Sequence, residues 1–240
     1  SGCGRCAELC PEHAISINDG GISVTDRDKC VRCGECVDEC YNEARTISGR
    51  AYGIPELIKT LEKDKMYWEE SGGEVMAQDM DYVVELAKRL HSKGYSVYID
   101  TCGFAPYENY EKILPYADVF LYDIKAINDD VHRSNTRVSN KLILDNLAKL
   151  GRAGAKIYIR MPLIAGLNDS EEDMLKVIAF LRDNSIPVLQ VNLLPYHELG
   201  QDKLEKLGKE RHDYGFNPPS KQHLNELVQL FNQNGYNNTK

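Results

Sequence analysis

Two patterns of hydrophobic and polar residues divide the chain. From Ile54 onward, stretches in which apolar residues recur every three to four positions alternate with short apolar runs. The first such pair is a helix predicted at 82–90 and a strand at 96–100. Three more pairs are predicted, each a strand and then a helix, at 119–124 and 139–150, 156–160 and 170–183, and 187–194 and 219–234. This alternation indicates an α/β fold with a parallel sheet, either open or closed into a barrel.

The N-terminal segment lacks this alternation. Two short apolar runs, 14–17 and 21–24, flank Asn18-Asp19-Gly20, a sequence typical of a hairpin turn. A segment this short holds too few apolar residues to fold alone, so we expect its folding to depend on metal binding. We therefore predict two domains, residues 1–45 and residues 46–240.

Seven of the eight cysteines lie in this first segment, in two runs. The runs are Cys3-x2-Cys6-x3-Cys10 and Cys30-x2-Cys33-x2-Cys36-x3-Cys40. This spacing is typical of a two-[4Fe–4S] module, in which each run gives three thiolates to one cluster and its fourth thiolate to the other. One cluster would then be held by Cys30, Cys33, Cys36 and Cys10. The other would be held by Cys3, Cys6, Cys40 and one further ligand, which we expect immediately upstream of Ser1.

Zinc sites and disulfide frameworks also use paired cysteines, but both fit this chain less well. Zinc sites usually present two ligands per run rather than three or four, and an acidic chain of 240 residues does not resemble a disulfide-stapled mini-protein. Thiolates on iron favour a reducing compartment, because oxygen and disulfide formation compete for the same sulfurs. Cys102 stands apart from the seven, and we predict a buried or partly buried thiol there.

Composition excludes several classes of function. The formal net charge of −8 gives no basic footprint for nucleic acid. No apolar run approaches the roughly 18 residues that a membrane-spanning helix needs. We therefore expect a cytoplasmic protein that binds neither nucleic acid nor membrane.

Polar residues gather at or just beyond the carboxyl ends of four successive predicted strands. They are Asp100, Thr101, Cys102, Asp123, Lys125, Arg160 and His197. Each alone has an ordinary explanation, such as a helix cap, a solvated loop residue, a structural ion pair or a surface histidine. Their recurrence on four strands favours a binding site, because ligands bind at this edge of a parallel sheet.

Five motifs occur in order downstream of the cysteine runs. They are Ser71-Gly72-Gly73-Glu74, Asp100-Thr101-Cys102-Gly103, Asp123-Ile124-Lys125, Ile159-Arg160-Met161-Pro162-Leu163-Ile164 and Leu194-Pro195-Tyr196-His197. With these motifs, the chain resembles the glycyl radical enzyme activating enzymes of the radical S-adenosylmethionine (radical SAM) superfamily, of the pyruvate formate-lyase activating type. The resemblance covers essentially all 240 residues. It implies a partial (β/α)6 barrel with a small ferredoxin-like domain that holds two [4Fe–4S] clusters.

The resemblance also implies an activity. In the family, a reduced [4Fe–4S] cluster in the barrel cleaves S-adenosylmethionine, and the resulting 5′-deoxyadenosyl radical takes a hydrogen from a glycine of a partner glycyl radical enzyme. The two ferredoxin-like clusters would relay electrons from a flavodoxin or ferredoxin, or would help to dock the partner.

Two features of the family are absent from this sequence. The C-x3-C-x2-C motif that holds the barrel cluster is missing, and so is a short strand between two Ser-Gly-Gly motifs. We expect the natural polypeptide to carry both, and with them a third cluster. The alternative is a degenerate copy or fragment that transfers electrons or binds a partner without radical chemistry. Because the barrel-cluster motif is missing, these 240 residues alone are expected to be inactive.

Particular roles follow from the resemblance alone. Contacts to the methionine amino group are implied for Gly72, Gly73 and Glu74. Positions around the methionine carboxylate and the adenosyl group are matched by Lys125, Arg160 and His197, and Lys125 and Arg160 are the expected catalytic residues. A monovalent-cation site beside S-adenosylmethionine is implied for Asp100, Thr101 and Asp123, with Asp123 also contacting S-adenosylmethionine.

Overall fold

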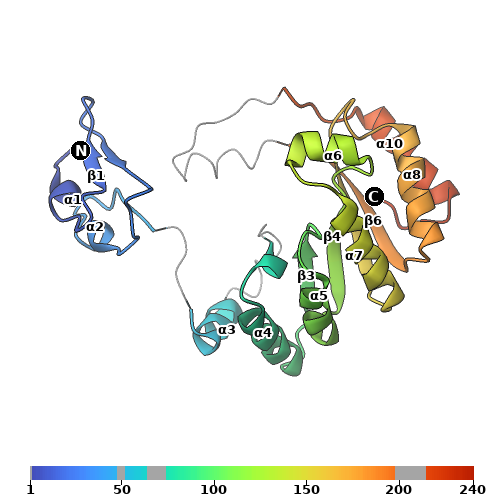
Figure 1. Cartoon of the computed structure of the whole chain (residues 1–240), viewed down its shortest axis with the longest axis horizontal. Coiled ribbons are helices and arrows are strands. Elements are labelled where there is room, and N and C mark those ends of the chain that lie inside the picture. The colour runs from blue at the N-terminus through green and yellow to red at the C-terminus, as the bar shows by residue number, and fades with distance from the viewer. Residues whose placement is uncertain (1, 48–51, 64–73, 198–214) are drawn as a thin grey trace. The chain divides into compact units, whose positions relative to one another are not determined.

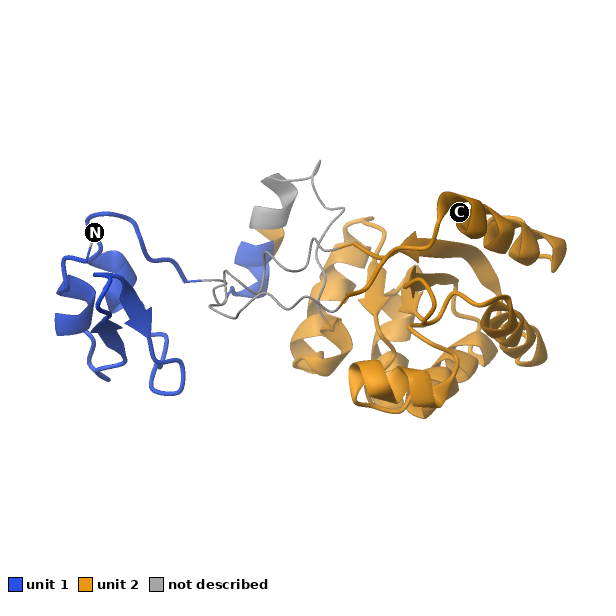
Figure 2. Cartoon of the chain, turned by 90° about the horizontal axis from the view of Figure 1, so that it is seen from above, with its two compact units in different colours: residues 1–57 blue, residues 58–240 orange. Residues whose placement is uncertain are grey.

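The computed structural model describes residues 2–47, 52–63, 74–197 and 215–240. The chain divides into two compact units, Ser1–Leu57 and Ile58–Lys240, which Figure 2 colours separately. Helix α3 (Ile54–Lys63) spans the boundary between them. The domain boundary predicted after residue 45 falls within the first unit and stays a prediction.

The first unit is small and has little core. It contains the short helices α1 (Arg5–Glu8) and α2 (Glu35–Asp38) and an antiparallel pair of strands, β1 (Ile15–Ile17) and β2 (Ser23–Thr25). The predicted hairpin is confirmed, and the side chain of Asn18 closes its turn by accepting hydrogen bonds from the amides of Gly20 and Ile22 at 3.1 and 2.9 Å.

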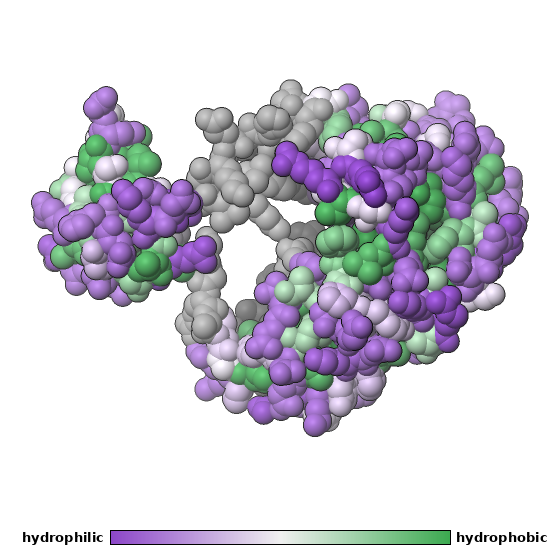
Figure 3. Space-filling model, in the orientation of Figure 1, coloured by the Kyte–Doolittle hydropathy of each residue, from purple (hydrophilic) through white to green (hydrophobic). Residues whose placement is uncertain are grey.

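Hydrophobic side chains of this unit lie largely at its surface. Ile22 is 64% exposed and Val31 is 62% exposed, and green hydrophobic areas are visible on the unit in Figure 3. Within its described part, the buried hydrophobic residues are Ala14 and Ile15. Such a core is too small to stabilise a fold by apolar burial, which agrees with folding that depends on bound metal.

The second unit is built on a parallel sheet, as the sequence predicts. Four strands lie in the order β3-β4-β5-β6 and all pair in parallel. Their bounds are Tyr98–Thr101, Val119–Asp123, Ile157–Leu163 and Val188–Pro195. The last residues of the chain extend this sheet, because the amide of Lys240 donates to the carbonyl of Val191 at 3.0 Å.

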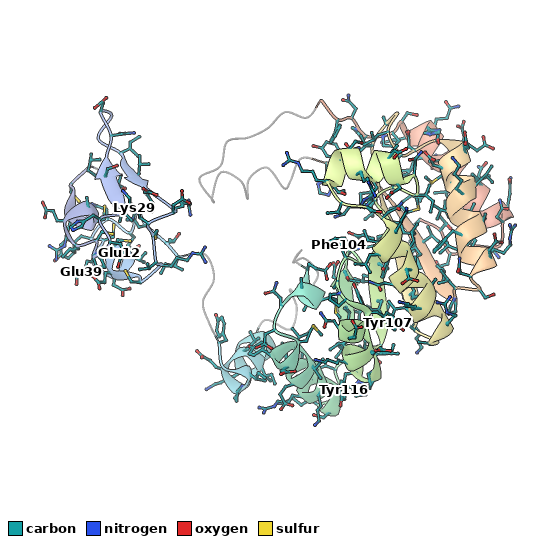
Figure 4. The ribbon with its side chains drawn as sticks, viewed as in Figure 1. Glu12, Lys29, Glu39, Phe104, Tyr107 and Tyr116 are labelled. Carbon is teal, nitrogen blue, oxygen red and sulfur yellow. The ribbon has the colours of Figure 1, made fainter. Side chains whose placement is uncertain are left out.

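Helices accompany every strand of the second unit, on the outer side of the arc that the strands form in Figure 1. The four helices predicted from apolar periodicity are confirmed as α4 (Met80–Ser92), α7 (Lys141–Arg152), α8 (Glu171–Asp183) and α10 (Lys221–Gln233). Shorter helices that the periodicity did not predict are η1 (Val75–Ala77), α5 (Tyr107–Ile113), η2 (Leu114–Tyr116) and α6 (Asp129–Thr136). The side chains of Tyr107 in α5 and Tyr116 in η2 are labelled in Figure 4, together with Phe104 before α5.

The two faces of the sheet differ in polarity. Along β5, Ile157, Ile159 and Met161 are buried, while Tyr158 and Arg160 between them are partly exposed. Successive residues of a strand point to opposite faces, so one face packs into the helix-covered core and the other carries polar groups. This alternation directs Arg160 away from the core and toward the predicted site.

A glycine permits the close packing that follows β3. Tyr122 is fully buried, and its hydroxyl donates to the carbonyl of Ile143 at 2.6 Å. Gly103 lies against it with φ 79°, and a Cβ atom at this position would be only 2.1 Å from the Tyr122 hydroxyl oxygen. The turn after β3 therefore needs a glycine both for its backbone conformation and for its lack of a side chain.

The substitution Gly103→Ala is expected to lower the free energy of unfolding by about 3 kcal/mol, because it adds overpacking to backbone strain. Gly94→Ala is the matched control, since Gly94 has φ 82° and no atom within 4 Å of the added Cβ. It should cost only the strain of about 1 kcal/mol. Urea unfolding followed by circular dichroism measures both. Equal losses would mean that the space around Gly103 is not limiting.

Candidate functional site

The polar face of the sheet brings three of the predicted site residues together. The guanidinium of Arg160 lies between the carboxylates of Asp100 and Asp123, each 2.8 Å from one of its nitrogens. Its Nη2 atom contacts both carboxylates as well. The strand register explains the arrangement, because Asp123 on β4 pairs with Arg160 on β5, and β3 with Asp100 lies on the other side of β4.

This group carries one more negative than positive charge. Burial raises the pKa of Asp123, and the positive charge of Arg160 only partly offsets the increase. Burial lowers the pKa of Arg160, but its bonds to Asp100 and the charges of both carboxylates outweigh that effect, and the pKa lies above its usual value. Because the Arg160 donors are directed at these carboxylates, binding a ligand carboxylate through Arg160 would require exchange of an existing ion pair.

Thr101 does not join this group. Its side chain lies on the other face of the sheet, is only 1% exposed, and is hydrogen-bonded to Tyr110 at 2.9 Å and to Glu74 at 3.0 Å. The structure therefore brings the side chains of Asp100 and Asp123 together without that of Thr101. Adjacent residues of a strand face opposite ways, so the motif could not place both side chains in one site.

The carboxylate of Glu74, the residue before η1, contacts the end of β3 and the turn that follows it. Its carboxylate accepts hydrogen bonds from the amide of Met76 at 3.0 Å, the hydroxyl of Thr101 and the amide of Cys102 at 2.7 Å. The thiol of Cys102 is half-buried, and burial together with Glu74 raises its pKa. Glu74 thus fixes the end of β3, a structural contact that the sequence did not indicate. Gly72 and Gly73 lie outside the described residues.

Lys125 and His197 lie near the same edge. Lys125 follows β4, is exposed, and lines a cavity of about 200 Å³ together with Pro162 and the buried His132 and Asn168. Within the described part of the chain, the Lys125 ammonium forms no ion pair. His197 is exposed and follows the end of β6. Sequence analysis also missed Asn192, which pairs in register with Arg160 on the partly exposed face of β6.

The first unit gathers cysteines around a second cavity. Cys3, Cys6 and Cys40 line a cavity of about 40 Å³. In the described ranges, no three His, Cys, Asp or Glu side chains are placed to hold a single metal ion. The thiolates around a four-iron cluster lie farther apart than the ligands of one ion, so the fit of a cluster depends on the donor set and its surroundings.

The surroundings of the sulfurs suit an iron–sulfur cluster. The amide of Ala14 donates to Cys10 Sγ at 3.3 Å. Backbone hydrogen bonds from Ala44 and Asn42 lower the pKa of the Cys40 thiol. Hydrogen bonds to sulfur stabilise thiolates and are one of the means by which proteins set the potential of such clusters. The residues present therefore fit the two clusters predicted for this unit.

A pair of glycines gives the two cysteine runs the same backbone shape. Gly4 and Gly34 have φ 80° and 96°, and each directly precedes a four-residue helix, α1 or α2. Each also follows the corresponding cysteine, Cys3 or Cys33. The left-handed conformation at these positions favours glycine.

Comparison with known proteins agrees with both units. Residues 1–44 match the 4Fe-4S dicluster domain, and residues 38–178 match the Radical SAM superfamily. The trans-4-hydroxy-L-proline dehydratase activating enzyme of Clostridioides difficile is 43% identical over 246 residues, covering 99% of this chain and 80% of the relative. The chain belongs to the glycyl radical enzyme activating enzymes. The predicted family is therefore confirmed.

Further members and structures are similar to this activating enzyme. The indoleacetate decarboxylase activating enzyme of Tractidigestivibacter scatoligenes is 32% identical over 249 residues, covering 98% of this chain and 78% of the relative. A domain of the pyruvate-formate lyase-activating enzyme from Bacteroides vulgatus matches with a TM-score of 0.59 and 26% identity, covering 71% of this chain and 94% of that domain. The second unit is thus a partial radical SAM barrel, of which the described residues contain four parallel strands. No described helix of this activating enzyme has the length and hydropathy to cross a membrane.

The substitution Arg160→Leu is expected to lower the free energy of unfolding by about 2 kcal/mol near neutral pH, because it leaves Asp123 buried without its counter-charge. Without Arg160 the pKa of Asp123 in the folded state rises further above its value in the unfolded state. Between these two pKa values the folded state holds a proton that the unfolded state has released. The deficit should therefore be largest at about pH 8 and should shrink toward about pH 5, as Asp123 becomes protonated.

Urea unfolding at the two pH values measures this change. Arg89→Leu is the control, because it removes an exposed helical pair with Glu85 and should cost under about 0.5 kcal/mol at either pH. A deficit of Arg160→Leu that does not vary with pH would contradict the role of Asp123.

Proposed function

We propose that this activating enzyme binds S-adenosylmethionine at the carboxyl edge of its parallel sheet, cleaves it reductively and installs a glycyl radical on a partner of the trans-4-hydroxy-L-proline dehydratase type. The group formed by Asp100, Arg160 and Asp123 is the observation that carries this assignment of the site. The partner type rests on the 43% identity with the dehydratase activating enzyme, against 32% for the indoleacetate decarboxylase activating enzyme.

The charges at this edge suit the two ends of the methionine group. The excess negative charge of Asp100 and Asp123 attracts the sulfonium and the ammonium of S-adenosylmethionine. We assign its carboxylate to Lys125, whose ammonium is exposed and unpaired among the described residues, and we place His197 beside the adenosyl group. Arg160 acts chiefly as a positioning residue that holds the two carboxylates in place. A monovalent cation would have to share those carboxylates with Arg160.

The first unit supplies the means of electron transfer. When bound, [4Fe–4S] clusters carry single electrons at potentials that reach far below zero. The seven cysteines of the first unit would supply four thiolates to one such cluster and three to a second, with a reduced flavodoxin or ferredoxin as the electron donor in a reducing cytoplasm. A third cluster, at the barrel, needs ligands that these 240 residues do not supply, since Cys102 is their only other cysteine.

The proposal is tested with the natural polypeptide, reconstituted anaerobically and mixed with reduced flavodoxin, S-adenosylmethionine and the dehydratase. We expect 5′-deoxyadenosine by chromatography and a glycyl radical signal by electron paramagnetic resonance. Clusters that are reduced without any 5′-deoxyadenosine would favour the alternative of an electron-transfer protein. An intact mass equal to 27.2 kDa would favour the same alternative, because the barrel cluster would then lack ligands.

Asp123→Ala is expected to reduce S-adenosylmethionine cleavage at least about tenfold, because it removes a carboxylate from the site while sparing the cysteine unit. Iron content should stay unchanged. Asp145→Ala is the control, since Asp145 only pairs with Lys149 on the surface of α7. Loss of iron in proportion to activity would mean that Asp123 is needed for folding instead.

Cys40→Ser is expected to remove one of the two clusters of the first unit, a loss of about four iron atoms per chain. Cys102→Ser should keep all the iron, because Cys102 lies in the second unit and its thiol is hydrogen-bonded to the side chain of Glu74. Iron analysis and visible absorption of the anaerobic protein measure both. Equal iron loss in the two variants would contradict the ligand assignment.

A further inference from the structure

The loop between α6 and α7 holds an arginine in an unusual conformation. Arg137 follows α6 with φ 66° and ψ 7°, in the left-handed region. This conformation is strained for a residue with a side chain, whereas glycine adopts it freely. Strain of this kind persists where the surroundings enforce it, and it is a reason to ask what the side chain does.

Hydrogen bonds on both sides of Arg137 enforce the conformation. The ring of His132 is only 2% exposed, and its Nδ1 donates to the carbonyl of Val138 at 2.8 Å. The hydroxyl of Thr136 donates to the carbonyl of His132 at 2.8 Å. The backbone is therefore fixed immediately before and after Arg137, and the direction in which its side chain leaves the chain is fixed as well.

The side chain of Arg137 is exposed and uncommitted. Across the described ranges it makes no hydrogen bond or ion pair, whereas Arg133 on the same helix pairs with Asp129 at 3.2 Å. The preceding residue, Thr136, lines the cavity that Lys125 also lines. Helix α6 lies beyond the carboxyl end of β4 (Figure 1), and its last residue shares a cavity with Lys125, so the loop that begins at Arg137 starts near the edge where the proposed site is.

The position of Arg137 at the end of α6 also has an ordinary electrostatic explanation. A positive charge near the last turn of a helix interacts favourably with the helix dipole, although at an exposed site the effect is small. The free energy gained from the helix dipole is at most similar to the free energy lost to the left-handed backbone. The dipole alone therefore gives no clear advantage to arginine over glycine at position 137. A role in binding accounts for an exposed and unpaired guanidinium that leaves a fixed backbone near the edge of the site.

We propose that Arg137 is a docking residue for the partner glycyl radical enzyme, and that its guanidinium pairs with a surface carboxylate of that enzyme. The proposal rests on the proposed function for the class of partner. A protein carboxylate fits because the fork of an arginine can donate two parallel hydrogen bonds to it. The carboxylate of S-adenosylmethionine is assigned to Lys125, and Arg137 is not among the residues that line the cavity.

Binding to immobilised trans-4-hydroxy-L-proline dehydratase of Clostridioides difficile tests the proposal without requiring catalysis. Arg137→Asn removes the charge while tolerating the left-handed backbone, and it should raise Kd about tenfold at about 0.05 M salt. The difference from the natural chain should shrink at about 0.3 M salt. Arg152→Asn is the matched control, since Arg152 is an exposed arginine at the end of α7, before β5 and so at the opposite edge of the sheet.

Two more measurements separate charge from backbone. Arg137→Lys keeps the charge at the same strained position and should bind the dehydratase within about threefold of the natural chain. The Kd for S-adenosylmethionine should be the same for Arg137→Asn and the natural chain, because the residue contacts the protein partner. A lysine variant as weak as the asparagine variant would overturn the proposal.

Other outcomes of these binding measurements also test the docking role of Arg137. Unchanged binding by Arg137→Asn, equal weakening by Arg152→Asn, or no binding of the natural chain to the dehydratase would each overturn the docking role. Tight binding of the natural polypeptide, reconstituted anaerobically, without any 5′-deoxyadenosine formation would contradict the proposed function while leaving the docking role in place. The two proposals can therefore fail separately.

Discussion

The bridge from Arg160 to Asp100 and Asp123 joins three neighbouring strands, and the arrangement of the site depends on it. Placing three charges on a partly buried face is costly, and such a group is stable only when each charge finds well-placed partners. The parallel register supplies this placement, because Asp123 and Arg160 are opposite one another on β4 and β5. The same bridge that fixes the strands thus sets the local charge that a cationic ligand meets.

Much of the fold could be predicted from periodicity, and the reasons for the failures are physical. Helices α4, α7, α8 and α10 each bury a regular apolar stripe, so their sequences indicate them. Helix α6 has one buried residue, His132, and is otherwise polar, so no apolar repeat marks it. Its start is set instead by Asn128, whose side chain accepts hydrogen bonds from two amides of the first turn.

The site was predicted as a set of positions, but not as a set of contacts. The recurrence of polar residues at strand ends located the edge, because it requires only the order of the elements. The ion pairs of Arg160 depend on register between strands, which one sequence does not contain. Thr101 was grouped with Asp100 because the family resemblance implies one cation site for both, although strand geometry directs their side chains to opposite faces. The contacts of Glu74 join residues distant in sequence, and no local pattern marks them.

The paired glycines of the cysteine unit have a consequence for electron flow. Because Gly4 and Gly34 adopt the same left-handed conformation before a short helix, the backbone of the two proposed cluster loops is similar around Cys3 and Cys33. Any preference of an electron for one cluster must then come largely from the side chains that differ. After Gly4 the run carries Arg5 and Glu8, whereas after Gly34 it carries Glu35, Asp38 and Glu39. Glu39, labelled in Figure 4, pairs with Arg5 at 2.7 Å. In the proposed electron transfer through this unit, these few surface charges would set the difference between the two loops and hence the direction of transfer.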